Sequence, residues 1–356
     1  VVKGNLSSLY PNSPGGVVNF LSDMNFNKSF IKFVSIAGEY NLFQGGLRAG
    51  LTGRNSKFFI SHTYKSYTGF RPHGAEYSHL LNANYITFPN SSTSVSILGN
   101  YVRGFVRFPG ALTQTEFNSD PFQAYYLSVA NDIKRITQKG RLAVKYKTNW
   151  GSLIKNEFEL IGYGSVKDLQ YTTNSSYFLK YKYIAGGTLR YTIKHSIFSK
   201  ENEFTAGTEY NYVTGPLTGY TNTGGNKEDD LESQNTETQN NSGFFFEDQF
   251  SLLKSKLFML LSGRYDILKF ESEDGLYGAR NSERSFKRFT PKAALNYKLT
   301  PTVSAYTSFG YGFDSPSSAE LENYLLSSDA GFATLNPDIN PQTSNNFEIG
   351  IKGNVF

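Results

Sequence analysis

Strand-like segments follow one another from Phe30 to Phe356, and the connections between them are alternately short and long. Gly, Asn, Ser and Pro fill the short connections, as expected for tight turns whose backbone polar groups face water. Tight turns at one end of a sheet and long loops at the other are typical of a transmembrane β-barrel, because its two ends face different compartments. The sequence therefore predicts an all-β, antiparallel transmembrane barrel with about 14 strands.

The expected strands cover residues 30–40, 43–52, 57–67, 78–88, 93–107, 139–149, 152–163, 187–198, 202–213, 243–253, 256–270, 286–299, 302–313 and 345–352. The expected short connections are 53–56, 89–92, 150–151, 199–201, 253–255 and 300–301. The expected long loops are 68–77, 108–138, 164–186, 214–242, 271–285 and 314–344. Only the first hairpin, at Tyr40-Asn41, is tight where the alternation requires a long loop.

Apolar and polar residues alternate within these segments, as they do in a strand whose side chains point to opposite faces. Between 203 and 212, one set is Phe204, Ala206, Thr208, Tyr210 and Tyr212. A soluble sandwich or propeller also alternates in this way. Several segments, however, reach the roughly 9–11 residues that a strand needs to cross a bilayer, which favours the membrane barrel.

Composition supports this class and excludes others. Aromatic residues make up 16% of the 356 residues, which suits the aromatic girdles of a membrane barrel. Mean hydropathy is −0.41 and the sequence has no run of about 20 apolar residues, so a helical membrane protein is excluded. The absence of Cys excludes disulfides and thiolate metal sites. A net charge of +5 from scattered Lys and Arg argues against nucleic-acid binding.

The first 20 residues carry a family resemblance. Val2-Lys3-Gly4, Ser7-Ser8-Leu9-Tyr10 and Gly15-Gly16-Val17-Val18-Asn19 resemble the end of the plug domain of TonB-dependent outer-membrane receptors. Within this plug motif we single out Gly4, Gly15, Gly16 and Asn19. The family usually has Gly after the Leu-Tyr pair, whereas this chain has Pro11, so the turn geometry differs at that point.

Further motifs follow in the order that the family has them. Gly69-Phe70-Arg71 resembles its Gly-aromatic-Arg element, and residues 108–113 resemble its Pro-Gly-x-Leu loop. Residues 308–316 resemble its strand-to-loop motif, although Asp314-Ser315 stands where haem-type members often carry Arg-Ala. The stretches 335–341 and 346–352 resemble its Asn-Pro-x-Leu and Asn-x-Glu-x-Gly-x-Lys signatures. The resemblance covers nearly the whole chain, and the joint order of these short motifs is specific.

The resemblance implies how the chain is organised. Family barrels have 22 strands around an N-terminal plug. We therefore expect a fragment, with the end of the plug in 1–28 and the N-terminal and central barrel in 29–356. Long loops would face outward and tight turns the periplasm, leaving unpaired strand edges near Phe30 and Phe347.

The resemblance also implies a function and partners. The expected protein is a monomeric receptor of the outer membrane, in contact with lipid and lipopolysaccharide. It imports a ferric siderophore or ferric citrate, with energy from TonB, ExbB and ExbD acting through a segment outside this sequence. It is not expected to be an enzyme, to carry a cofactor or to bind nucleic acid.

Arginine with aromatic neighbours is the expected ligand surface, because ferric siderophores and ferric citrate are usually anionic. Arg71, Arg103 and Arg107 lie near the outward ends of their segments and are the candidate residues. Arg103 and Arg107 share a period-two face with Tyr101 and Phe105, which we assign to the lumen. Structural ion pairing inside the barrel is the alternative for both arginines.

Three further candidates lie in the expected outward loops. His73 shares the first long loop with Arg71 and would contact the same ligand, and the alternative is a solvated loop histidine. Tyr125 and Tyr126 lie in the 108–138 loop, where they would either hold ligand or pack the loop.

No other segment indicates a catalytic or metal-binding site. The sequence has no catalytic set, and its four histidines, at 62, 73, 79 and 195, are too dispersed for a metal site. Glu228-Asp229-Asp230 could ligate Ca²⁺, but a hydrated loop is the simpler interpretation. Residues 317–328 predict a short helix, begun by a Ser317–Glu320 capping box, that packs over the barrel mouth.

The sequence leaves three rival functions open. Haem import by the same fold is disfavoured because no His lies between Asp314 and Ser344. Cobalamin or glycan import is another alternative. A passive porin or an adhesin is an alternative of a different class, and the plug motif argues against it.

Overall fold

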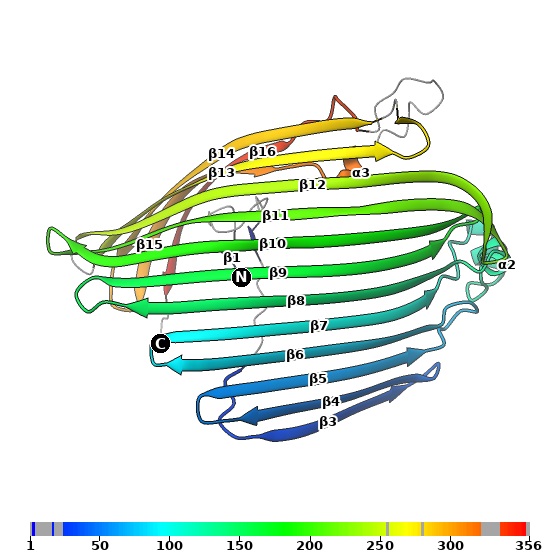
Figure 1. The fold of residues 1–356 in the computed structure, drawn as a ribbon, viewed down its shortest axis with the longest axis horizontal. Coiled ribbons are helices and arrows are strands. Elements are labelled where there is room, and N and C mark those ends of the chain that lie inside the picture. The colour runs from blue at the N-terminus through cyan, green and yellow to red at the C-terminus, as the bar shows by residue number, and fades with distance from the viewer. Residues whose placement is uncertain are drawn as a thin grey trace.

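The structure, a computed structural model, describes residues 2–3, 16–17, 24–253, 256–278, 281–321 and 335–353, and within these it is dominated by one antiparallel sheet. Its 14 strands follow one another in sequence order, each hydrogen-bonded to the next, as Figure 1 shows. The strands are β3 (Phe30–Gly38), β4 (Leu42–Thr52), β5 (Ser56–Tyr67), β6 (Glu76–Asn90), β7 (Thr93–Arg107), β8 (Lys134–Trp150), β9 (Lys155–Thr172), β10 (Ser176–Ile197), β11 (Lys200–Thr223), β12 (Asn226–Leu253), β13 (Leu257–Asp274), β14 (Ser282–Lys298), β15 (Val303–Asp314) and β16 (Gln342–Gly353). The all-β class and the strand number predicted from the sequence are confirmed.

The smaller elements are few in the described residues. β1 (Val2–Lys3) pairs with β2 (Gly16–Val17), and the helices are α1 (Gln114–Ser119), α2 (Tyr126–Ala130) and α3 (Ser318–Leu321). Gly16 therefore lies in a strand, whereas the plug-motif residues Gly4, Gly15 and Asn19 lie outside the described residues. None of the described helices is long and apolar enough to cross a membrane.

The two faces of the large sheet differ in chemistry. Across β8, β9 and β10, Tyr146, Leu160 and Leu189 lie side by side on one face and are 37%, 45% and 40% exposed. On the opposite face Arg190 lies beside Glu159, which is only 6% exposed. Figure 1 shows that the sheet is curled, so one face is concave and the other is convex. The face that carries Glu159 and Arg190 is the more buried of the two, which identifies it as the concave, inner face. The apolar face is the outer one.

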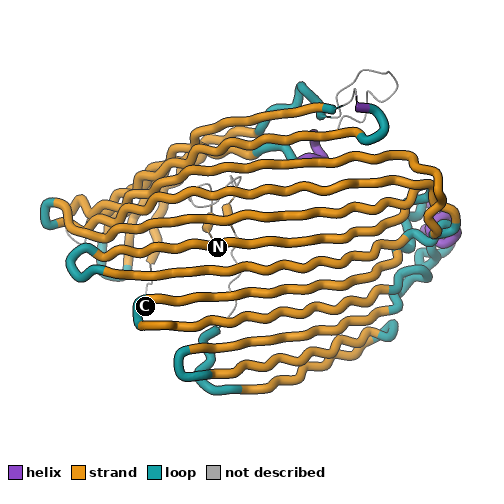
Figure 2. Tube along the Cα trace, viewed as in Figure 1, coloured by secondary structure: helices purple, strands orange, loops and turns teal. Residues whose placement is uncertain are grey.

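The alternation of turns is only partly as predicted. Long connections follow β5 (68–75), β7 (108–133) and β15 (315–341, of which the structure describes 315–321 and 335–341). Successive strands run in opposite directions, so all three connections start from the same end of the sheet, and the first two are seen at the right of Figure 2. At this end the first hairpin is tight, with Tyr40 and Asn41 at φ of 56° and 55°, as a two-residue turn requires.

The prediction of long loops at 164–186 and 214–242 is wrong. Here β9 and β10 continue to a turn at 173–175, and β11 and β12 continue to a turn at Gly224-Gly225, with φ of 59° and 88°. β12 is 28 residues long, on the order of 90 Å, about three times the hydrocarbon thickness of a bilayer. A strand this long can include polar stretches without alternating apolar residues, because backbone hydrogen bonds hold it to its neighbours. Hydroxyl pairs such as Thr214–Thr238, at 2.8 Å, add to these bonds.

The inner side of the mouth holds an apolar cluster, lined by Leu268, Phe270, Phe286, Phe313, Leu321 and Leu335. Leu321 ends α3, whose start is the predicted capping box: Ser317 N donates to Glu320 Oε2 at 2.7 Å, and Glu320 N donates to Ser317 Oγ. The rest of the predicted helix, 322–328, lies outside the described residues.

The sheet has two edges. In the described chain β3 and β16 each pair with one neighbour, so the predicted edges near Phe30 and Phe347 are confirmed.

Candidate ligand-binding site

Arg71 joins the two loops at the mouth, residues 68–75 and 108–133, which we call the loop assembly. Its Nε donates to the Gln123 carbonyl at 2.8 Å, and one terminal nitrogen donates to the Pro109 carbonyl at 3.4 Å. Beside it the Phe70 and Phe122 rings meet edge to face, with centroids 6.4 Å apart. Arg71 is therefore placed in the mouth, as the sequence predicts, but its guanidinium orders backbone there.

The 108–133 loop is built on two short helices. Thr113 caps α1 and forms a capping box with Glu116, and the hydrogen bonds from Thr113 lower the pKa of that carboxyl. Tyr125 precedes α2 and donates its backbone N–H to the Pro109 carbonyl at 2.7 Å. Its ring packs on Tyr126, with centroids 5.1 Å apart, while Tyr126 is 66% exposed. The structure thus gives Tyr125 a packing role and leaves Tyr126 open to solvent.

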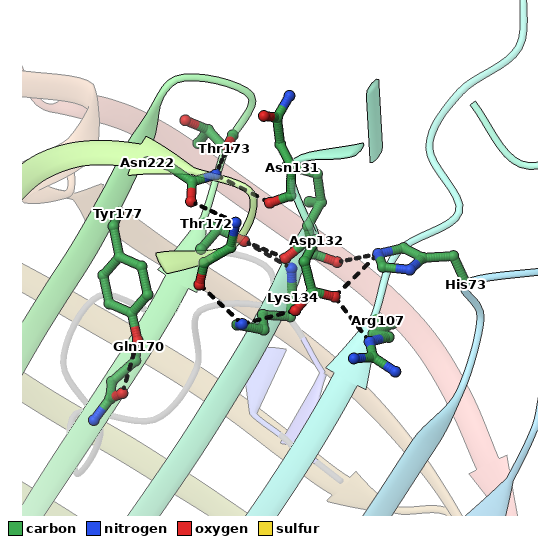
Figure 3. A network of polar contacts seen from close by, with 12 residues as sticks. His73, Arg107, Asn131, Asp132, Lys134, Gln170, Thr172, Thr173, Tyr177 and Asn222 are labelled. Carbon is green, nitrogen blue, oxygen red and sulfur yellow. Dashed lines mark hydrogen bonds and ion pairs between the residues drawn. The ribbon is translucent and has the colours of Figure 1, made fainter. Parts of the chain in front are cut away.

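Asp132 forms the centre of a polar network drawn in Figure 3. Its carboxylate accepts hydrogen bonds from Arg107 Nε at 2.9 Å and Lys134 Nζ at 2.7 Å. His73 Nε2 lies 3.7 Å from the same carboxylate and 3.2 Å from the Ile133 carbonyl. Burial raises the pKa of Asp132, but the hydrogen bonds from Lys134 and Arg107 outweigh it and hold the pKa below its ordinary value. Two predicted ligand residues, His73 and Arg107, are therefore brought together around an acid.

The tip of the β11–β12 hairpin closes this network. Lys134 Nζ donates to the Gly225 carbonyl at 3.0 Å, and Asn222 Nδ2 donates to the carbonyls of Asn131 and Thr173 at 3.0 and 2.9 Å. Figure 1 shows the two strands bending over so that their tip lies beside α2. We call His73, Arg107, Asp132, Lys134 and the hairpin tip at 222–225 the Asp132 network. Sequence reasoning missed Asp132 and Gly225, although Gly224-Gly225 between Thr and Asn is a hairpin signal.

Arg103 lies on the outer face, so the assignment of its face to the lumen is wrong. It shares its face with Ile97 and Tyr101, which are 40% and 41% exposed, and its partners on the neighbouring strands are His79 and Gln138. The inner face of β7 is instead the even-numbered set Ser94, Ser96, Leu98, Asn100 and Val102. Alternation separates two sets of side chains, but it does not say which set is inside.

Ion pairs cover the inner face toward the tight turns. Glu159 forms ion pairs with Lys145 at 2.5 Å and with Arg190 at 3.0 Å. Further along the sheet the Arg264 guanidinium, 3% exposed, lies 2.7 Å from Asp266 and 3.2 Å from Glu209. We call these two clusters the paired region.

Three lysines lie side by side on the inner face toward the long loops. Lys139 of β8 is the register partner of Lys167 of β9, and Lys167 is the register partner of Lys182 of β10. All three are half-buried, and within the described part of the chain none of them forms an ion pair. Lys180, on the same face of β10, is 3.7 Å from Glu237. We call Lys139, Lys167 and Lys182 the lysine row; the sequence analysis did not find it.

A large apolar depression lies on the outer face, away from these charges. It encloses about 930 Å³, and its walls are mostly small and aromatic residues such as Gly99, Tyr101, Gly162 and Tyr183. A Cβ added at Gly99 or Gly162 would meet nothing within 4 Å, which places the hollow above these glycines. Its apolar wall suits contact with hydrocarbon rather than with a charged ligand.

The described residues contain no group of three or more His, Cys, Asp or Glu side chains arranged to hold a metal ion.

Comparison with known proteins agrees with this architecture. A family profile described as "TonB dependent receptor-like, beta-barrel" matches residues 47–356. The unliganded ferric citrate transporter FecA superposes with a TM-score of 0.78 at 16% identity, over 99% of this chain and 53% of that one. The siderophore receptor PiuA of Acinetobacter baumannii gives 0.76 at 14% identity, over 99% and 59%. The copper transporter OprC gives 0.72 at 13% identity, over 99% and 55%. The chain spans between half and three fifths of the length of these structures, and at such identities the likeness shows the fold.

Proposed function

The chain belongs to the TonB-dependent receptor β-barrel family, and from this premise we propose that it acts in the import of an iron chelate across an outer membrane. The chelate is captured at the mouth formed by the long loops and passes along the charged inner face. Energy arrives from TonB, with ExbB and ExbD. Residues 1–28 act as the end of a plug, and the receptor works as a monomer.

The observation that carries the proposal is the division of the sheet into two faces. Leu142, Leu160 and Ile351 are 57%, 45% and 73% exposed on the outer face, which suits lipid. The inner face carries Lys, Arg and Glu, whose hydration would suit a polar cargo. A soluble sandwich would bury its apolar face against a second sheet, and among the described strands no second large sheet exists.

The two ends of the sheet supply the orientation. The loop assembly and the Asp132 network are elaborate and polar, as expected for an outward surface that meets ligand. The turns at the other end are short, so that end faces the periplasm. The strands β10–β12 would then project far beyond the bilayer on the outward side.

Iron is proposed as the cargo metal from the solved structures of similar fold. Their names include a ferric citrate transporter, a ferric-catecholate import receptor of E. coli K12 and a siderophore receptor. The absence of His between Asp314 and Ser344 supports a chelate over haem.

Uptake by a strain that lacks the full-length gene tests the proposal. We expect growth on at least one ferric siderophore or ferric citrate, with radioactive iron uptake, to be lost and to return on complementation. Deletion of tonB should abolish the same uptake, whereas a diffusing sugar controls for general permeability. Uptake of every iron chelate and of haem at wild-type rates in the deletion strain would overturn the iron assignment.

A further inference from the structure

We propose that the lysine row is a binding site for a multiply anionic iron chelate, one whose exposed groups are carboxylates or catecholate oxygens. The inference rests on the proposed function, because it assigns a place and a charge class to the imported ligand. It names residues of β8, β9 and β10 that lie on the inner face, the face opposite to that of the predicted Arg103.

The first support is the register. Lys139, Lys167 and Lys182 are direct neighbours across three successive strands, in an unbroken ladder. Side chains directly opposite on one face have Cβ atoms about 5 Å apart, and like charges placed there repel. Three adjacent ammonium groups therefore oppose the folding of the sheet unless an anion lies among them.

The second support is the missing counter-charge. The strands beyond the row offer no acid beside it: Val102 of β7 is the register partner of Lys139, and the first acid on the far side is Glu237 of β12. Glu237 already lies 3.7 Å from Lys180. Elsewhere on the same face, cations such as Lys145 and Arg190 have an acid within 3.0 Å. Among the described residues the row therefore presents three positive charges against one nearby acid, Glu237, which lines the same small hollow as Lys182 and is already 3.7 Å from Lys180.

The third support is position. The row lies toward the long loops, so a ligand that enters the mouth reaches it before the paired region. Lys180 and Lys182 line the same small hollow as Ser318, the first residue of α3, which belongs to the long connection at the mouth. The row is thus at the boundary between the mouth and the inner face.

The chemistry of the lysines sets the ligand class. An ammonium is a compact point charge on a flexible stem with three donors, and it does not impose the planar geometry of a guanidinium. Such a site selects total negative charge more than shape. A ferric citrate and a ferric tris-catecholate both qualify, whereas a neutral ferric tris-hydroxamate does not.

Binding by the purified full-length receptor provides the test, with ferric citrate, a ferric tris-catecholate and a neutral ferric tris-hydroxamate as probes. Replacing one row lysine by Gln should weaken binding of the anionic probe about tenfold, and K139Q/K167Q/K182Q about a hundredfold or more. Lys-to-Arg variants keep the charge and should retain affinity. The salt dependence of binding should fall in the Gln variants. Lys147→Gln is the matched control, since Lys147 lies on the same face but is paired with Glu157 at 2.9 Å.

Stability separates a ligand site from a structural one. Without ligand the triple Gln variant should unfold at the same or a higher urea concentration than wild type, because repulsion is removed. A loss of stability together with unchanged affinity would overturn the inference. So would a wild-type preference for the neutral hydroxamate.

A chelate-free measurement keeps the inference separate from the proposed function. Iron-free citrate should protect Lys139, Lys167 and Lys182 from amine acetylation more than it protects Lys147. Protection without any chelate import would leave the row as an anion site and refute iron import. Import of an anionic chelate that the triple variant conducts normally would refute the row and leave the proposed function standing. Equal acetylation of all four lysines with and without citrate would also count against the row.

Discussion

The paired region and the lysine row occupy the same inner face, yet they use charge in opposite ways. In the paired region Lys145 and Arg190 converge on Glu159, and Arg264 lies between Glu209 and Asp266. In the row, Lys139, Lys167 and Lys182 face one another. Inner-face charge near the tight turns is paired across the strands, whereas the lysine row, nearer the mouth, forms no ion pair within the described residues.

The largest effect is expected from a substitution in the paired region. Arg264→Gln removes a guanidinium that is 3% exposed and lies over the Phe245 ring at 5.8 Å. Because the buried Asp266 and the partly buried Glu209 would remain without their partner, the free energy of unfolding should fall by about 3–5 kcal/mol. Urea unfolding of the full-length receptor in lipid vesicles, followed by circular dichroism, measures this.

Lys139→Gln is the control for that measurement. It removes a charge from the same face, so a general loss of inner-face charge would destabilise both variants equally. We expect no loss of unfolding free energy for Lys139→Gln. Similar losses in the two variants would contradict the distinction between the regions.

A smaller effect is expected in the Asp132 network. There, charges at the mouth form ion pairs that hold loops together. Asp132→Asn keeps the shape but weakens contacts to Arg107, Lys134 and His73, and should cost about 1–3 kcal/mol of local stability. Hydrogen exchange should accelerate at 131–134 and at 222–225. Asp120→Asn is the control, because Asp120 is exposed and accepts only local hydrogen bonds.

The pH dependence of this network follows from the pKa of Asp132. Its folded-state pKa is below the ordinary value of about 3.9, so its stabilising contribution is fully present above that value. The contribution is lost as pH falls through the lower folded-state pKa. Exchange at 222–225 should therefore stay slow from neutral pH to about pH 4 and accelerate only below it, after correction for intrinsic rates. Acceleration well above pH 4 would contradict the assignment to Asp132.

A backbone substitution tests whether the hairpin tip depends on the same network. Gly225 has φ of 88°, and an added Cβ would lie 2.5 Å from Asp132 Cβ. Gly225→Ala should cost about 1–2 kcal/mol, because it strains the turn and pushes on the network. Gly162→Ala is the matched control, since a Cβ there meets nothing within 4 Å. Equal unfolding midpoints for the two variants would show that the Asp132 network does not hold the β11–β12 hairpin tip in place.

The sequence predicted the fold further than it predicted the site. Alternation and turn residues were sufficient for the sheet, the strand number, the edges and the Ser317 capping box. They failed in 164–186 and 214–242, where the strands continue in place of the expected loops and polar pairs such as Thr214 and Thr238 join them. In 177–185 an apolar and aromatic set, Tyr177, Leu179, Tyr181, Tyr183 and Ala185, does alternate with a set that contains Lys180 and Lys182, and the sequence analysis did not recognise it.

The lysine row was invisible for the same reason. Lys167 and Lys182 fell inside an expected loop, and Lys139 began an expected strand, so nothing related the three. Placing the turn at 173–175 makes Lys167 and Lys182 register partners, and the hairpin before it does the same for Lys139 and Lys167. Long-range register, set by turns, was the missing information.

The smallest expected effect comes from the arginine whose face was assigned wrongly. Arg103 and Lys139 are near neighbours, because Arg103 pairs with Gln138 while Lys139 pairs with Val102. A one-residue step reverses the face of a strand, so Arg103 lies outside and Lys139 inside. Arg103→Gln should therefore change affinity for an anionic chelate by less than about twofold, whereas Lys139→Gln lowers it about tenfold. Measured on the full-length receptor at low salt, a larger loss for Arg103→Gln would mean that the ligand approaches the outer rim, and the inner face would lose its claim to the site.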